Sequence, residues 1–107
     1  MITKGDFKTM KELGKRLKQL RNERGLTMDM VVIDMNSRYD IEIHKSNISR
    51  WEAGTTDPSL LHAKYLAEYY NVSIDYLIGL TDSRIPSRLI AYAKGMNRKK
   101  KDGEDDD

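Results

Sequence analysis

No cysteine occurs in this chain, which excludes disulfides, thiolate chemistry and cysteine-ligated metal sites. The two histidines, His44 and His62, have no acidic or histidine partner at the spacing of a metal-ligand set, so no metal site is expected. Apolar runs such as Met30–Ile33 are far shorter than the about 20 residues that span a bilayer. The N-terminus also lacks the apolar core of a secretory leader. We therefore expect a cytoplasmic protein without membrane contact.

The sequence also lacks the groupings expected of an enzyme. No nucleophile–base pair, phosphate-binding loop or set of metal ligands can be recognised in it. Acidic residues such as Asp34 and Glu42 have no apolar or substrate-binding surroundings that would suit acid–base chemistry. We expect no catalytic residue and no cofactor.

Charge is strongly segregated along the 107 residues, although the net charge is only +2. Residues 1–26 carry eight Lys or Arg against three acids, and residues 83–101 carry seven and no acid. Residues 27–58 hold three basic residues against six acids, and residues 102–107 include five acids. A basic face is typical of nucleic-acid binders, but most of the positive charge lies outside the central segment. Because counterion release scales with the number of phosphates contacted, this distribution predicts modest non-specific binding.

Apolar periodicity predicts a chain built of helices. Leu13, Leu17 and Leu20 recur at helical spacing, which predicts a helix from about Met10 to Arg24 that ends at Gly25. A second helix is expected to start at Met28, with Thr27 as its N-cap, and a third to cover Lys45–Ala53 and end at Gly54. A fourth is expected to start near Pro58, and a short fifth to cover Ile74–Ile78 and end at Gly79. The expected buried face of the helix near Pro58 consists of Leu60, Ala63, Leu66, Ala67 and Tyr70.

These elements predict one small domain with flanking segments. Residues 1–9 are expected to be a flexible N-terminus, and residues 10–80 are expected to form the domain. Residues 81–97 form a C-terminal segment, in which 86–96 has the apolar spacing of a candidate sixth helix. Residues 98–107 are first basic and then acidic, hold nothing apolar to bury, and are expected to be disordered.

A family resemblance is carried by the order of short motifs along residues 10–80. These are Leu20-Arg21, Gly25-Leu26-Thr27, Ile48-Ser49-Arg50-Trp51-Glu52-x-Gly54, Pro58-Ser59-Leu60 and Val72-Ser73-x-x-Tyr76-Leu77. The order resembles the Cro/repressor-type (Xre-like) helix-turn-helix family of transcriptional regulators. The resemblance implies an all-α fold, a compact five-helix bundle of the lambda-repressor-like type. It also implies a sequence-specific repressor of double-stranded DNA, most like those of phages and mobile elements in bacteria.

The same resemblance makes Lys45–Ala53 the recognition helix, which would enter the major groove. Its expected base contacts are Lys45, Ser46, Ser49 and Arg50, which spacings of one and four turn to one side. The expected phosphate contacts are Thr27, Met28, Asn47, Thr55 and Thr56. Arg21 and Glu52 are expected to form a half-exposed internal bridge, and Trp51 to be a partly buried prop rather than a wedge between base pairs.

The chain departs from the family pattern between its second and third expected helices. The distance from Leu26 to Glu52 is longer than usual in the family, and the usual glycine turn is absent. The inserted residues, within about Ser37–His44, would lengthen the second helix or form a loop. Asp40 to Ile43 alternate with a period of two and are interpreted as an irregular connector. Either outcome could change the angle of the recognition helix, and His44 stands where a Ser or Thr cap is expected.

Three tyrosines suggest a surface for self-association. Tyr65 and Tyr69 fall outside the expected buried face of their helix, and Tyr76 can join them from the next helix. A homodimer built there would place two recognition helices about 34 Å apart and would require a pseudo-palindromic operator. The alternative function is a protein-interaction module, an antitoxin or adaptor that binds a partner protein through residues 59–96.

Overall fold

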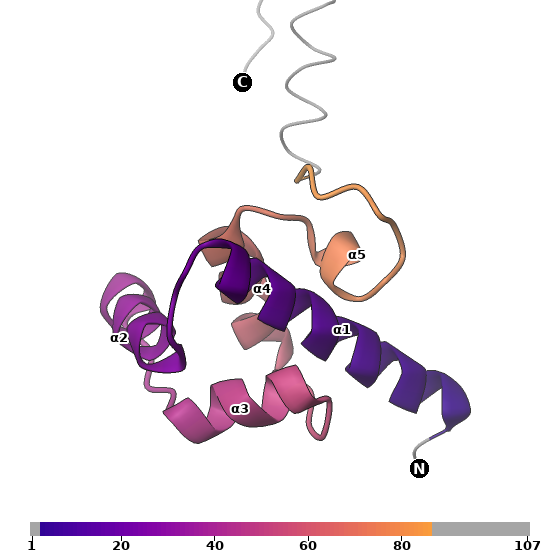
Figure 1. Ribbon diagram of the computed structural model, residues 1–107, viewed down its shortest axis with the longest axis horizontal. Coiled ribbons are helices and arrows are strands. Elements are labelled where there is room, and N and C mark those ends of the chain that lie inside the picture. Colours follow the sequence, from indigo (N-terminus) through magenta and orange to yellow (C-terminus); the bar gives the residue numbers. More distant parts are fainter. Residues whose placement is uncertain (1–2, 87–107) are drawn as a thin grey trace, which may run out of the picture.

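The computed structural model describes residues 3–86, which form five helices (Figure 1). They are α1 (Lys4–Glu23), α2 (Met28–Tyr39), α3 (Lys45–Ala53), α4 (Leu60–Tyr70) and α5 (Ile74–Leu77). Residues 3–86 contain no strand, and the predicted all-α fold is confirmed. Within this range no helix is both long and apolar enough to cross a membrane. The candidate sixth helix at 86–96 falls, apart from its first residue, outside the described residues, and so does the tail at 98–107.

The first helix begins at Lys4, six residues before the predicted start near Met10. Thr3 Oγ1 accepts a hydrogen bond from the Asp6 N–H at 3.1 Å, and the Asp6 carboxylate accepts one from the Thr3 N–H at 2.9 Å. This reciprocal capping box satisfies two backbone donors at the start of the helix. The prediction was wrong because it followed the apolar stripe, whose first buried residue is Met10. The cap, not the stripe, marks the beginning of α1.

The fourth helix also differs from its prediction. Pro58 lies before it, and α4 begins at Leu60 behind Ser59, whose side chain accepts a hydrogen bond from the His62 N–H at 3.1 Å. Leu60 is 81% exposed and is not part of the buried face. The buried residues of α4 are Leu66, Ala67, Tyr69 and Tyr70. The first turn of α4 therefore extends beyond the core, and the buried face is rotated relative to the predicted one.

Helix α1 is the centre of the arrangement. In Figure 1 it lies between α3 on one side and α5 on the other, and α2 lies at its C-terminal end. Leu13, Leu17 and Leu20 are buried as predicted, and they pack with buried apolar residues from the other four helices and the connector. The fully buried members of this core are Met35, Ile43, Leu66, Leu77 and Val31. Each such side chain stabilises the fold by about 1.5–3 kcal/mol relative to an exposed position.

Candidate nucleic-acid interface

Helix α3 has a buried side and a polar exposed side. Ile48 and Trp51 are 3% and 4% exposed and anchor the helix in the core. The four residues expected to contact bases, Lys45, Ser46, Ser49 and Arg50, are all exposed. Trp51 packs tilted against His62 with ring centroids 5.4 Å apart, so it supports the helix from inside, as predicted. The outer side of α3 thus offers cationic and hydroxyl groups on a helix that the core holds in place.

The connector before α3 is an ordered loop. Helix α2 ends at Tyr39, and Asp40 takes a left-handed conformation with φ of 53°. Residues 41–44 form neither helix nor strand, which confirms the irregular connector predicted at Asp40–Ile43, and α2 extends to Tyr39, within the range expected for the insertion. The amide of Asn36 donates to the Ile43 carbonyl at 2.9 Å and accepts from the Ile43 N–H at 2.8 Å. This pair of hydrogen bonds ties the connector to α2 immediately before α3 begins.

Replacing Asn36 with alanine is expected to lower the free energy of unfolding by about 1–3 kcal/mol, because both backbone groups of the buried Ile43 lose their partner. Urea unfolding followed by circular dichroism measures this effect. The neighbouring Ser37 is exposed and serves as the matched control. Ser37→Ala should change stability by no more than about 0.5 kcal/mol. Equal effects of the two substitutions would contradict the assigned role of Asn36.

The N-terminus of α3 is capped by its own third residue. The His44 N–H donates to Asn47 Oδ1 at 2.8 Å, and the His44 side chain makes no capping hydrogen bond. Asn47 is half-buried, and its side-chain oxygen is engaged in this cap. Its amide nitrogen, the group that can donate to a phosphate oxygen, makes no hydrogen bond within residues 3–86, so the cap is compatible with the expected phosphate contact.

The remaining expected phosphate contacts flank α3 on two sides. Thr27 is exposed and caps α2 by accepting a hydrogen bond from the Met30 N–H at 3.1 Å. Thr55 and Thr56 are exposed in the loop after α3, and the Thr55 hydroxyl donates to the Arg50 carbonyl at 3.2 Å. The half-buried Met28 lines a hollow together with residues of α1 and α3. The residues that line this hollow are Lys18, Met28, Ser49, Glu52 and Ala53. The start of α2 and the exposed side of α3 therefore meet at one surface.

A buried ion pair fixes α3 to α1. Arg21 Nε and a terminal nitrogen of the same guanidinium donate to the two oxygens of Glu52, at 2.7 and 2.9 Å. The third donor in this arrangement, Nη1 of Arg21, binds the Leu26 carbonyl at 2.9 Å. The side chains are 12% and 5% exposed, so the bridge is more buried than the half-exposed pair expected from the sequence. The hydrogen bonds to Glu52 raise the pKa of Arg21, so the guanidinium stays protonated.

The expected tyrosine surface is wrong for two of its three members. Tyr69 and Tyr76 are 5% and 6% exposed. Tyr65 is half-buried and stacks on Tyr39 with ring centroids 4.4 Å apart. The Tyr76 ring lies beneath the guanidinium of Arg16. The error follows from the rotated buried face of α4, which places Leu60 at the surface and Tyr69 in the core, the reverse of the prediction.

The hydroxyl of Tyr69 donates to Asp34 at 2.6 Å, and burial together with this bond raises the pKa of Tyr69 from 10.0 to about 12. A phenol whose pKa is higher in the folded than in the unfolded chain stabilises the fold fully below the unfolded pKa. That contribution is lost as the pH rises from about 10 toward 12. We expect the free energy of unfolding, measured in urea, to fall over this range by less in Tyr69→Phe than in the wild type. Parallel pH profiles for the two proteins would contradict this coupling.

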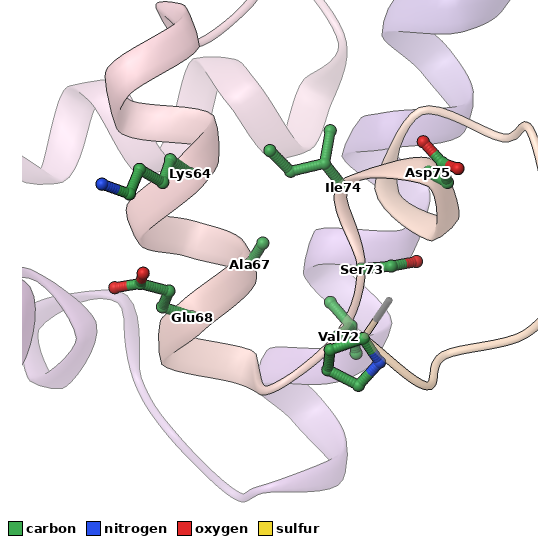
Figure 2. A pocket seen from close by; sticks show the side chains of 8 residues that line it. Lys64, Ala67, Glu68, Val72, Ser73, Ile74 and Asp75 are labelled. Carbon is green, nitrogen blue, oxygen red and sulfur yellow. The ribbon is translucent and has the colours of Figure 1, made fainter. Parts of the chain in front are cut away.

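A separate hollow lies between α4 and α5, away from α3 (Figure 2). It is lined by Lys64, Ala67, Glu68, Val72, Ser73, Ile74, Asp75 and Pro86. Figure 2 shows Lys64 and Glu68 projecting from α4 at its edge, with Ala67, Val72 and Ile74 deeper between the two helices.

Comparison with known proteins identifies the family. Residues 14–83 match a family described as a helix-turn-helix domain. The chain is 39% identical over 71 residues to the uncharacterized HTH-type transcriptional regulator YobD of Bacillus subtilis, a match covering 66% of this chain and 58% of that protein. It is 30% identical over 95 residues to the HTH-type transcriptional regulator ImmR of the same organism, covering 89% of this chain and 70% of that protein. No solved structure gives a significant match.

Proposed function

This chain belongs to the helix-turn-helix domain family, and we propose that it is a sequence-specific double-stranded DNA-binding transcriptional regulator. It acts as a repressor that reads the major groove with α3. Both similar proteins are named as HTH-type transcriptional regulators, which supports this class of function. The matched part is only 58% of the length of YobD, so the remainder of that protein gives no guide to this chain.

One observation supports this function above the others: the exposed side of α3 is polar while its opposite side is held rigidly. Ile48 and Trp51 bury the inner side, and the Arg21–Glu52 bridge fixes the C-terminal half. Lys45 and Arg50 then project outward near the two ends of a short helix. The major groove of B-DNA is about 12 Å wide and accepts one α-helix. Arg and Lys suit the O6 and N7 acceptors of guanine, and Ser46 and Ser49 can bind either base edges or phosphates.

Phosphate contacts would set the position of α3 in the groove. The exposed Thr27 with Met28 at the start of α2, and Thr55 with Thr56 after α3, border the proposed base-reading side from two directions. Backbone N–H groups at the start of a helix and threonine hydroxyls bind phosphate oxygens. Such contacts orient the protein on the duplex but carry no sequence information.

The protein acts on DNA as a homodimer in this proposal. Two recognition helices must lie about 34 Å apart to reach successive major grooves on one face of B-DNA. The operator would then be pseudo-palindromic. The buried Tyr69 and Tyr76 cannot form the dimer surface in this fold, and the surface proposed in their place is the half-buried Tyr65 with the exposed Leu60 and Leu61 of α4.

Selection of bound duplexes from a random-sequence pool tests the function and yields the half-site spacing. Arg50→Ala is then expected to weaken binding to the selected sequence by about 1–3 kcal/mol and to relax the preference at the base pairs it contacts. Lys64 is exposed on α4, away from this side, and Lys64→Ala is the matched control with unchanged preference. A folded wild-type protein that enriches no sequence would contradict the proposal.

A protein-interaction module, such as an antitoxin or adaptor, is the second candidate. The hollow between α4 and α5 and the exposed Leu60, Leu61 and Leu80 favour it, because all of them lie in residues 59–86. Under this alternative, substitutions on α3 would leave the main activity unchanged, and substitution of the exposed leucines would abolish it. Selection from the random-sequence pool distinguishes the two, since an adaptor of this kind enriches no DNA sequence.

A further inference from the structure

Helix α1 carries five lysines on one face, at Lys4, Lys8, Lys11, Lys15 and Lys18. Their spacings of three and four residues make each a neighbour of the next on the helix surface. All five are exposed. At 1.5 Å per residue this row, here called the lysine ridge, is about 21 Å long. It contains most of the positive charge of the N-terminal part of the chain.

The lysine ridge starts beside α3. Lys18 lines the same hollow as Met28 and Ser49, at the surface where α2 and α3 meet. About two turns further toward the N-terminus, the Lys11 ammonium donates to the Ala53 carbonyl at the end of α3, at 3.3 Å. The ridge therefore follows the proposed DNA-binding side and then continues beyond it. Figure 1 shows the N-terminal end of α1 projecting past the end of α3.

None of the three acids of α1 forms an ion pair with the ridge, and Asp6 instead caps the start of the helix by accepting a hydrogen bond from the Thr3 N–H. Glu12 pairs with Arg16 at 2.7 Å, and Glu23 pairs with Arg84 at 2.8 Å, on the flank of α1 that faces α5 and the loop after it. Within residues 3–86 no carboxylate forms an ion pair with a lysine of the ridge. The ridge is thus a row of unneutralised charges, and such a row attracts a polyanion.

The first part of α1 does not contribute to the core. Residues 4–9 are all exposed, and Met10 is the first buried residue. A helix end without packing gains little from tertiary contacts, yet the Thr3 cap keeps it helical. This projecting end carries Lys4 and Lys8 and extends the ridge beyond the globular body.

We propose that the lysine ridge binds the phosphate backbone of the DNA that flanks the base pairs read by α3. This inference rests on the proposed function and extends the expected contact area along the duplex. Lysine ammoniums act as flexible point charges, which suits sequence-independent phosphate contacts rather than base recognition. The positive charge of residues 1–26, although far from α3 in sequence, then lies beside it on the folded protein.

The test replaces Lys4, Lys8 and Lys15 with glutamine, since none of these three supports another element through a hydrogen bond within the described residues. Binding is measured by fluorescence anisotropy on a long duplex containing the selected sequence and on one lacking it, between about 50 and 200 mM salt. Removing one phosphate contact should lower the magnitude of the slope of log K against log salt by about 0.9. Removing three per subunit should therefore lower it by about 2.7 for each bound subunit, and by about twice that for a bound homodimer. Affinity should fall equally on both duplexes, so the sequence preference stays unchanged.

Two control variants make the result specific to the ridge. Replacing the same three lysines with arginine should retain the wild-type slope, and Lys64→Gln on α4 should change it by much less per charge. A folded glutamine variant with the wild-type slope would overturn the proposal, as would an equal change per charge in Lys64→Gln. If the wild type shows no sequence preference, the proposed function fails, whereas the slope measured on non-specific duplex still decides whether the ridge contacts phosphates.

Discussion

Glu52→Ala is expected to lower the free energy of unfolding by about 3–5 kcal/mol, because it leaves the guanidinium of Arg21 buried without its counter-charge. The wild-type pair makes two short hydrogen bonds, at 2.7 and 2.9 Å, and both side chains are largely shielded from water. The Leu26 carbonyl can satisfy only one of the Arg21 donors. Urea unfolding measures the loss, and the binding of selected DNA reports whether α3 has moved.

Two comparisons separate the cost of an unpaired charge from the cost of reduced packing. Replacing both Arg21 and Glu52 with methionine should lower the free energy of unfolding much less than Glu52→Ala alone, because no buried charge remains. The exposed pair of Glu23 and Arg84 provides the surface reference, and Glu23→Ala should lower the free energy of unfolding much less than Glu52→Ala, because water screens an exposed ion pair. A double variant as unstable as the single one would show that packing, and not charge, is what the bridge contributes.

The second large effect is expected at Gly14, where α1 and α3 approach closely. A Cβ at this position would lie 2.5 Å from the Glu52 carbonyl oxygen and 2.6 Å from that of Trp51. Both are backbone atoms, so the two helices must separate to accept a methyl group. Gly14→Ala is therefore expected to destabilise the fold by about 3 kcal/mol, the upper end of the usual range for overpacking. Thermal and urea unfolding measure this loss.

Gly5 is the matched control for this substitution. It also lies in α1, and its added Cβ would meet only the Thr3 side chain, at an ordinary 3.6 Å. Gly5→Ala should stabilise the protein slightly, by about 0.5–1 kcal/mol, since alanine is the better helix former. If Gly14→Ala lowers the free energy of unfolding and Gly5→Ala raises it, then the close contact between α1 and α3, and not helix propensity, requires glycine at position 14. Destabilisation by both substitutions would contradict that reasoning.

Much of the fold could be predicted from local patterns. The leucine stripe of α1, the cap Thr27 and the stop Gly54 each depend on near neighbours in the chain, and the structure has all three where they were expected. The exposed side of α3 followed from its lack of apolar residues. The buried face of α4 could not be predicted from the local pattern, because tyrosine is amphipathic and occurs on both the buried and the exposed side of a helix. The partners of Tyr69 and Tyr76, on α2 and α1, decided their position.

The sequence by itself determined the helical class, the limits of α3 and the polar character of its outer side, because these depend on residues within a few positions of one another. Only the tertiary structure decided which distant groups meet. It buried the Arg21–Glu52 bridge, required glycine at position 14, and brought Lys11 and Lys18 of α1 beside α3. The physical reason is that periodicity specifies one face of a helix, whereas the crossing of two helices determines what each face contacts.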